Sequence, residues 1–305
     1  MTIKEALKKY HKIEIELLLA HVLRKPKEFL YLHPDHRLNT RQITQISRIA
    51  KRREKGEPIA YILGYKDFMG HRFKVNRNVL IPRPETERLI EYTLSVIPEF
   101  AVGKYPESSS KVLDSRFRGN DKVVKPDDKL RIKDEGLRIL DLGTGGGCII
   151  ISLAKMLGSK GYEFYASDIS TKALQAAKIN ARIHKTKIKF IHSDILKNVR
   201  MSFDIIIANL PYGWNAWKNN TSAETIGLKF EPQNALFTKE KGLLLIRKFL
   251  KQVALMKEKP SLIFLEHDPR QKKALSTIIK KFLPKARIKF HKDFNNFWRY
   301  AEIML

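Results

Sequence analysis

Apolar residues recur at helical spacing over the first part of the chain, from Ile3 to about Gly56. Two groups show it: Leu17, Leu18, Leu19, Val22 and Leu23, and then Ile43, Ile46, Ile49 and Ala50. Such spacing places apolar side chains on one face of a helix. Asn39 and Thr40 supply polar side chains suited to cap the second helix. We predict a small helical domain over residues 1–60.

Residues 61–81 show the shorter period of β-strands instead. Phe68 and Phe73 flank a turn at Met69-Gly70, and a second turn follows at Asn76-Arg77-Asn78. Short apolar runs bounded by such residues are typical of hairpins. We therefore predict a β-hairpin that connects the helical domain to the rest of the chain.

A helix should begin after Arg83 and end near Ile97. Pro84 suits a first helical turn, and Glu85 and Glu87 favour the positive end of the helix dipole. Residues 103–136 are polar and without sustained periodicity, so they offer little apolar surface to offset the entropy of ordering them. We interpret them as a flexible insertion within a second domain, residues 82–305.

Beyond residue 136, short apolar runs alternate with helical patterns. The predicted strands are LRILDLG, YEFYASD, IKFIHSD, FDIIIANLP, SLIFLEHD, ARIKFH and RYAEIML. Strands separated by helices indicate an α/β fold with a mostly parallel, doubly wound, Rossmann-like sheet. Ligands bind such sheets beyond the carboxyl ends of the strands, so the residues just after each strand should carry the chemistry.

Composition sets outer limits on the function. The chain has 305 residues, no apolar run near the roughly 18 residues of a membrane span, and a first segment that mixes charges of both signs, unlike a signal peptide. Cys148 is the only cysteine, which excludes an intrachain disulfide and a cysteine-rich metal site. The histidines show no metal-ligand spacing. We expect a cytoplasmic, monomeric enzyme without a metal.

The net charge is the unusual number: 59 Lys and Arg face 32 Asp and Glu, for a formal charge of +27. Such a charge favours a polyanionic partner, or a partner that itself works on RNA. However, the basic residues are spread along the whole chain, as on an ordinary solvated surface. Direct binding of nucleic acid is compatible with this charge but not required by it.

Glycine residues and an acid follow the first strand of the sheet. The segment consists of Asp141, Leu142, Gly143, Thr144, Gly145, Gly146, Gly147 and Cys148. Glycines here let a ligand approach the backbone closely, although their spacing is not that of dinucleotide-binding loops. A carboxylate at Asp141 suits a cationic ligand better than a phosphate. A merely tight turn is the alternative.

The next two strands also end in acids, Asp168 and Asp194. Asp168 lies 21 residues after Gly147 (168 − 147 = 21), near the separation expected of an acid that binds ribose hydroxyls. Asp194 could accept a hydrogen bond from an adenine amino group while Ile195 packs on the ring. A helix cap is the alternative at both places, by Asp168 or Ser170 after the second strand and by Asp194 after the third.

The fourth strand stops at Asn209-Leu210-Pro211-Tyr212. Together, DLGTGGG, ASDIS, HSDIL and this tetrapeptide resemble the class I S-adenosylmethionine (SAM)-dependent methyltransferases, whose (Asn/Asp)-Pro-Pro-(Tyr/Phe/Trp) motif serves planar amino groups. Leu210 departs from the family proline. EPIAYILGYKDFMGHRFKV, LIPRPETE and FEPQNAL further resemble the HemK/PrmC family, and LEHDPRQ is a fainter match.

The resemblance implies SAM as a consumed co-substrate, a helical N-terminal substrate-recognition domain, and N5 methylation of the glutamine in the Gly-Gly-Gln motif of peptide chain release factors. The oxygens of the Asn209 side chain and the Leu210 main chain would each accept one hydrogen of the glutamine NH₂. Pro211 would restrict the turn, and Tyr212 would lie against the amide. The implied cofactor site comprises Asp141, Gly143, Thr144, Gly145, Gly146, Gly147, Asp168, Asp194, Ile195 and Asn209.

Several alternatives stay open. The substrate could be a ribosomal-protein glutamine, or an adenine N6 of nucleic acid, because Asn-Leu-Pro-Tyr also occurs in rRNA adenine dimethyltransferases. A non-catalytic SAM-binding protein is a further alternative. Arg83, Glu85 and Thr86 line the cofactor pocket or anchor the hinge between domains, and Glu231-Pro232 shapes the substrate channel or a structural loop. Trp214 and Trp217 form a lid or are plain loop aromatics.

Overall fold

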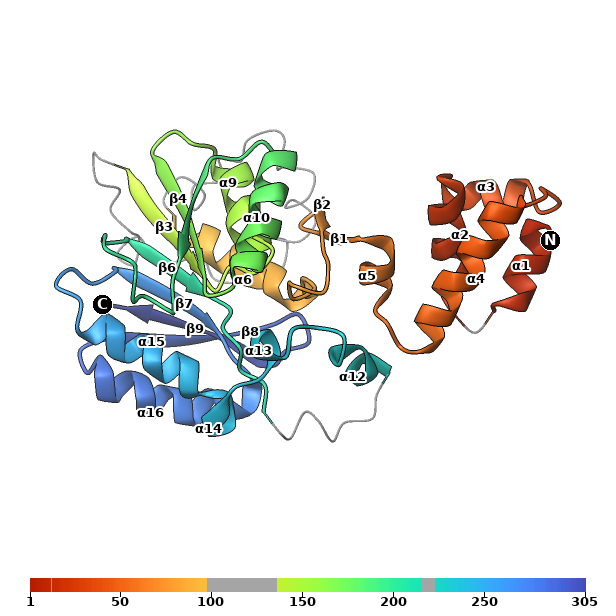
Figure 1. The fold of residues 1–305 in the computed structure, drawn as a ribbon. Helices are drawn as coiled ribbons and strands as arrows, with labels where there is room; N and C mark the ends of the chain where they lie inside the picture. The colour runs from red at the N-terminus through yellow and green to blue at the C-terminus, as the bar shows by residue number, and fades with distance from the viewer. Residues whose placement is uncertain (12, 98–135, 215–222) are drawn as a thin grey trace.

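The computed structural model describes residues 1–11, 13–97, 136–214 and 223–305. Apart from Gly136, the predicted insertion at 103–136 lies outside the described residues, and so does Trp217. Figure 1 shows a group of N-terminal helices set to one side of a larger body built on a twisted sheet. No helix of the described ranges combines the length and the apolar character that crossing a membrane requires.

The N-terminal group consists of helices α1 (Ile3–Lys9), α2 (Ile15–Leu23), α3 (Lys27–Leu32), α4 (Thr40–Glu54) and α5 (Ile59–Leu63). Its buried residues form a core of their own, which includes Ile3, Leu18, Leu19, Leu30 and Ile46. Asn39 accepts a hydrogen bond from the backbone N–H of Gln42, which confirms the predicted cap.

The connector begins within α5 and continues in the strands β1 (Tyr65–Phe68) and β2 (His71–Lys74), which pair antiparallel around Met69-Gly70 as predicted. The strand that the sequence predicts at Tyr61 is a helix instead, because Tyr61 lies in α5. Pro58 precedes this helical turn and Gly64, in the left-handed region, ends it. Pro58 and Gly64 favour a short helix here, and their effect outweighs the strand preference of the apolar residues between them.

The larger body contains a seven-stranded sheet of order β5-β4-β3-β6-β7-β9-β8. The strands are β3 (Leu137–Leu142), β4 (Tyr162–Asp168), β5 (Ile188–His192), β6 (Ile205–Ala208), β7 (Leu262–Glu266), β8 (Arg287–Lys292) and β9 (Trp298–Met304). β9 runs antiparallel to both of its neighbours, and the other pairs are parallel. The mostly parallel, doubly wound α/β sheet predicted from the sequence is confirmed.

Helices cover both faces of this sheet, as Figure 1 shows. α6 (Pro84–Ser95), α9 (Cys148–Leu157) and α10 (Thr171–Ile183) pack on one face, and α15 (Leu244–Ala254) and α16 (Lys272–Phe282) on the other. Short helices α12 (Ala223–Leu228), α13 (Gln233–Leu236), α14 (Lys239–Gly242) and η2 (Pro269–Gln271) connect β6 to α15 and β7 to α16.

The strand order reverses between β3 and β6, which makes their carboxyl ends the switch point where ligands bind in such sheets. One buried side chain ties the hairpin to this point. Asn180 accepts from the Lys74 backbone N–H at 2.8 Å, and its own NH₂ donates to the carbonyls of Lys74 and Gly146 at 3.0 and 2.9 Å. The hairpin and the glycine loop are thereby fixed to the same helix, α10.

Candidate active site

The loop after β3 is shaped by a buried carboxylate. The Thr144 hydroxyl donates to Asp141 Oδ2 at 2.6 Å, and the Asp141 side chain is fully buried. Burial raises the pKa of Asp141 to about 7, against the opposing effect of the Thr144 hydrogen bond. Neither residue lies on the walls of the cavity described below, so both act from behind the loop. This placement does not support a direct contact of Asp141 or Thr144 with a cofactor.

The glycines of this loop divide in the same way. Gly143 and Gly145 line the cavity, whereas Gly146 and Gly147 do not. Gly147 begins α9 with a φ of 83°, and a Cβ there would lie 2.9 Å from Ile151 and 3.1 Å from the Ala177 side chain. Its glycine is therefore required by the close packing of α9 and α10.

Asp168, at the end of β4, points its carboxylate at the glycine loop. Oδ2 accepts from the Gly145 backbone N–H at 2.9 Å and Oδ1 from the Ser170 N–H at 2.8 Å. The cap of α10 is Ser170, whose hydroxyl oxygen accepts from Ala173 N. The alternative in which Asp168 itself caps the helix is thus wrong, and Asp168 stays half-buried on the cavity wall. Burial raises its pKa above the usual range.

Asp194 and Ile195 follow β5 and also line the cavity. Lys248, from α15, donates to Asp194 Oδ2 at 2.5 Å. Ile195 has a φ of 57°, a left-handed conformation that a β-branched residue rarely adopts. Such strain persists where the surroundings fix it, and it occurs often at ligand sites. The Ile195 side chain is held at the wall of the cavity by this backbone turn.

These residues enclose a cavity of about 490 Å³, within the range of small-molecule sites. Its wall combines Gly143, Gly145, Asp168, Asp194 and Ile195 with Leu80 of the connector and with Asn209, Leu210 and Pro211. The set fits SAM: two carboxylates for hydroxyl and amino groups, glycine backbone, and an apolar side chain for a ring. Arg83, Glu85 and Thr86 do not lie on it.

The tetrapeptide after β6 is anchored from three directions. Asn209 Nδ2 donates to the Thr86 hydroxyl at 3.2 Å, and the Tyr212 hydroxyl donates to Glu266 Oε1 at 2.7 Å. Gln271 Nε2 donates to the Tyr212 carbonyl at 2.9 Å. Leu210 is buried among the residues that pack under α15. Burial and the Glu266 carboxylate raise the pKa of Tyr212 well above its ordinary value.

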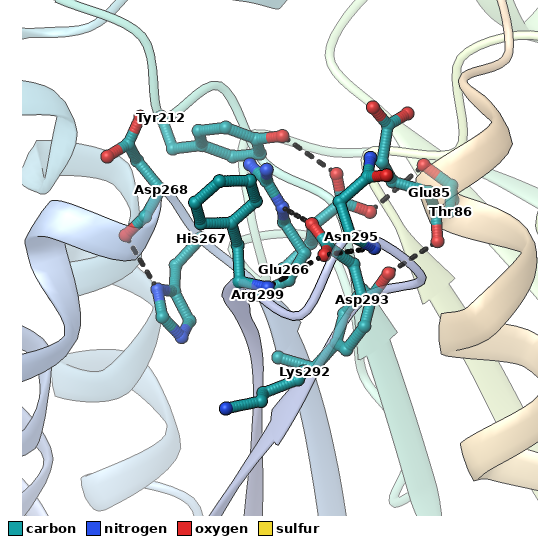
Figure 2. Close-up of polar contacts among 12 residues, drawn as sticks. Glu85, Thr86, Tyr212, Glu266, His267, Asp268, Lys292, Asp293, Asn295 and Arg299 are labelled. Atoms are coloured by element: carbon teal, nitrogen blue, oxygen red, sulfur yellow. Dashed lines mark hydrogen bonds and ion pairs between the residues drawn. The ribbon is translucent and has the colours of Figure 1, made fainter.

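Figure 2 shows Glu266 between Thr86 and Tyr212. Its Oε2 accepts from the Thr86 hydroxyl at 2.9 Å, and the carboxylate is almost fully buried. Burial raises the pKa of Glu266, while the two hydrogen bonds oppose that shift. Close by, Arg299 donates to the buried Asp293 at 3.0 Å.

A second cavity of about 1090 Å³ opens on the other side of the tetrapeptide. Asn209, Leu210 and Pro211 line both cavities, and Tyr212 lines only this one. Glu231 lies on its wall, where it accepts from the Ile81 N–H at 3.0 Å and from Arg83 Nη2 at 2.5 Å. Glu231 therefore lines this cavity and also holds the end of the connector at Ile81.

The second cavity is also lined by charged side chains, among them Asp268 and Arg270. Asp268 binds Arg270 through two hydrogen bonds of 2.8 Å, and the Arg270 guanidinium lies 4.5 Å from the Trp214 ring centroid. Arg53 of α4 also lines the cavity, so the N-terminal helices reach it. Sequence reasoning missed Glu266 and Gln271 as anchors of the site, and the faint LEHDPRQ match was the one signal that contained them.

Known proteins resemble the chain in both of its parts. Residues 3–64 match the PrmC N-terminal domain family, and residues 133–289 match a methyltransferase domain family. The release factor glutamine methyltransferase of Coxiella burnetii is 32% identical over 92% of this chain and 90% of its own length, and that of Lactococcus lactis is 31% identical over 84% and 81%.

Other matches are longer or more distant. A bifunctional methyltransferase of Rickettsia bellii is 39% identical, and the chain spans about half or less of the length of this and other Rickettsia relatives. The crystal structure of the hMettl16 catalytic domain in complex with MAT2A 3′UTR hairpin 1 shares the fold at 14% identity, with a TM-score of 0.51 over 94% of this chain and 90% of that one.

Proposed function

Since the chain belongs to the family of release factor glutamine methyltransferases, we propose that it transfers a methyl group from SAM to N5 of the glutamine in the Gly-Gly-Gln motif of peptide chain release factors. The observation that carries this proposal is the meeting of two cavities at Asn209, Leu210 and Pro211. A site of about 490 Å³ on one side and one of about 1090 Å³ on the other suit a small methyl donor and a protein segment.

The chemistry of an amide explains what the tetrapeptide must do. An amide nitrogen is a weak nucleophile because its lone pair is delocalised into the carbonyl, so attack on a methyl group requires a fixed, in-line approach. The Asn209 Oδ1 and Leu210 carbonyl oxygens, which accept one hydrogen each, would hold the NH₂ group. Two acceptors also favour the developing positive charge on nitrogen.

SAM supplies an electrophilic sulfonium methyl when it is bound, and Gly143, Gly145, Asp168, Asp194 and Ile195 are the residues that we propose to hold it. The chain needs no strong base, because the methylated nitrogen is far more acidic than the amide and its proton can leave to water. Tyr212 contributes its ring as a wall for the flat amide, with its hydroxyl fixed by Glu266.

We propose residues 1–60 as the substrate-recognition domain, residues 61–81 as the connector and residues 82–305 as the catalytic domain. Arg53 on the wall of the larger cavity supports this division, because a protein bound there would touch the N-terminal helices. Arg53 is itself held by Glu14 through hydrogen bonds of 2.7 and 2.9 Å. The guanidinium of this lining residue is thus restrained by Glu14, which precedes α2.

The test is incubation with radiolabelled SAM and a purified release factor beside total RNA. We expect label in the release factor, at the Gly-Gly-Gln glutamine by peptide mapping, and none in RNA. Label in RNA alone would refute the proposal in favour of adenine methylation, and label in a ribosomal protein would favour the ribosomal-protein alternative.

Asn209→Ala tests the site itself. We expect this variant to lose transfer, because it removes one of the two acceptors, while calorimetry shows SAM binding within about threefold of the unaltered chain. Near-normal transfer would remove Asn209 from its proposed role. The melting temperature of each chain, measured by circular dichroism, serves as the control for folding.

A further inference from the structure

Resting on the proposed function, we propose that Thr86 and Glu266 are positioning residues that fix which way the Asn209 side-chain amide faces. They form a directional chain of hydrogen bonds from β7 through α6 to the end of β6. Asn209 donates to Thr86, and Thr86 donates to Glu266.

The donor and acceptor in each of these two hydrogen bonds follow from the chemistry of the three side chains. Both oxygens of Glu266 accept, Oε1 from the Tyr212 hydroxyl and Oε2 from the Thr86 hydroxyl, so the single hydroxyl hydrogen of Thr86 is committed to Glu266. Towards Asn209 the Thr86 oxygen can then only accept. Asn209 must therefore present its NH₂ to Thr86 and turn Oδ1 the opposite way.

The turned-out oxygen is the one that the proposed reaction uses. Asn209 lines both cavities, and in the described part of the chain its Oδ1 has no hydrogen-bond partner. If the amide rotated by half a turn, its NH₂ would face the NH₂ of a substrate glutamine, and two donors would oppose each other. Thr86 and Glu266 prevent this rotation without touching the substrate nitrogen.

The hydrogen bonds from Asn209 through Thr86 to Glu266 are largely buried, so reversing or breaking them costs free energy. Thr86 is 2% exposed and Glu266 is 1% exposed, so water does not offer them other partners. Glu266 also accepts from the Tyr212 hydroxyl at 2.7 Å. One carboxylate thus orients both the first and the last residue of the tetrapeptide.

Three substitutions and one control test the proposal. Thr86→Val keeps the shape and removes the hydroxyl, Thr86→Ser keeps the hydroxyl, and Glu266→Gln leaves one acceptor oxygen for two donors. Thr93→Val is the matched control, because Thr93 is a buried residue of the same helix whose hydroxyl donates only to the Leu89 carbonyl. Each variant is compared for kcat, for KM of SAM and for thermal stability.

We expect Thr86→Val and Glu266→Gln to lower kcat about tenfold or more, since one net hydrogen bond corresponds to a factor of that size. KM for SAM should stay within about twofold, Thr86→Ser should keep kcat within about threefold, and Thr93→Val should equal the unaltered chain. The proposal is overturned if Thr86→Val keeps normal kcat, or if Thr86→Ser is as impaired as Thr86→Val.

A second measurement does not depend on the substrate. If the unaltered chain transfers no methyl group to a release factor, the proposed function fails, and the orientation of Asn209 is read from its side-chain NH₂ signals in a ¹⁵N NMR spectrum. Thr86→Val should shift these signals and speed the exchange of one proton, and Thr86→Ser and Thr93→Val should not. Unchanged signals in Thr86→Val would overturn the positioning role.

Discussion

Gly242→Ala should displace the tetrapeptide from behind. Gly242 has a φ of 84°, and a Cβ there would lie 1.9 Å from the Tyr212 carbonyl oxygen and 2.4 Å from Gln271 Nε2. Real Cβ atoms essentially never lie closer than 3.0 Å to such neighbours, so residue 242 and the Tyr212 carbonyl must move apart by about 1 Å (3.0 − 1.9). That carbonyl belongs to the residue that we place against the substrate amide.

The cost in stability can be worked out from the contacts that break. An alanine in the left-handed region costs about 1 kcal/mol. Gln271 Nε2 donates to the carbonyls of Tyr212 and Lys241 at 2.9 and 2.8 Å, and losing both bonds costs about 1 kcal/mol each. We expect the free energy of unfolding to fall by about 3 kcal/mol and kcat to fall about a hundredfold, since a misplacement of about 1 Å has an effect of that order.

Urea denaturation and the methyl-transfer assay measure the two effects. The matched control is Gly64→Ala, because Gly64 also has a left-handed φ of 81° but no atom within 4 Å of a Cβ. This control should lose only about 1 kcal/mol of backbone strain and keep its kcat. If Gly242→Ala behaves like Gly64→Ala in both assays, the reasoning from steric contact is refuted.

Two further predictions concern the other wall of the site. Burial raises the pKa of Asp141 to about 7, so between about pH 4 and pH 7 the folded chain holds a proton there that the unfolded chain has released. The free energy of unfolding should therefore fall as pH rises from about 4 to 7, by up to about 1.4 kcal/mol per pH unit. Asp141→Asn should flatten this part of the urea-denaturation profile, and an unchanged slope would contradict it. Leu210→Pro should keep kcat within about threefold, because the carbonyl of residue 210 remains, and a larger loss in the transfer assay would show that the leucine side chain is needed.

The sheet could be predicted from the sequence because its central strands are buried on both faces. Segments such as Ile205–Ala208 and Leu262–Glu266 are therefore continuous apolar runs that end at polar residues. The same rule located Asp168, Asp194 and Asn209 at the carboxyl ends, where the structure brings them to one cavity. Strand ends meet at one edge of a parallel sheet, so a local pattern was enough.

The rest depended on contacts between distant segments. Asn209 and Thr86 are 123 positions apart, and Thr86 and Glu266 are 180 apart, so no local period relates them. The place of Asp141 before the glycines predicts a cofactor contact, but a side chain at a strand end can point into the core as well as out of it, and Asp141 is fully buried. Its bond to Thr144, three positions later, closes the loop on the buried side.

The departure at Leu210 is best understood through these distant contacts. A proline would restrain the tetrapeptide by fixing one backbone angle. Here the Asn209 amide, the Tyr212 hydroxyl and the Tyr212 carbonyl are each held by a side chain from another element, Thr86, Glu266 and Gln271. We infer that the shape of the motif does not depend on the missing proline. A leucine is then tolerated because its main-chain oxygen, which the proposed reaction needs, is placed by the neighbours on either side.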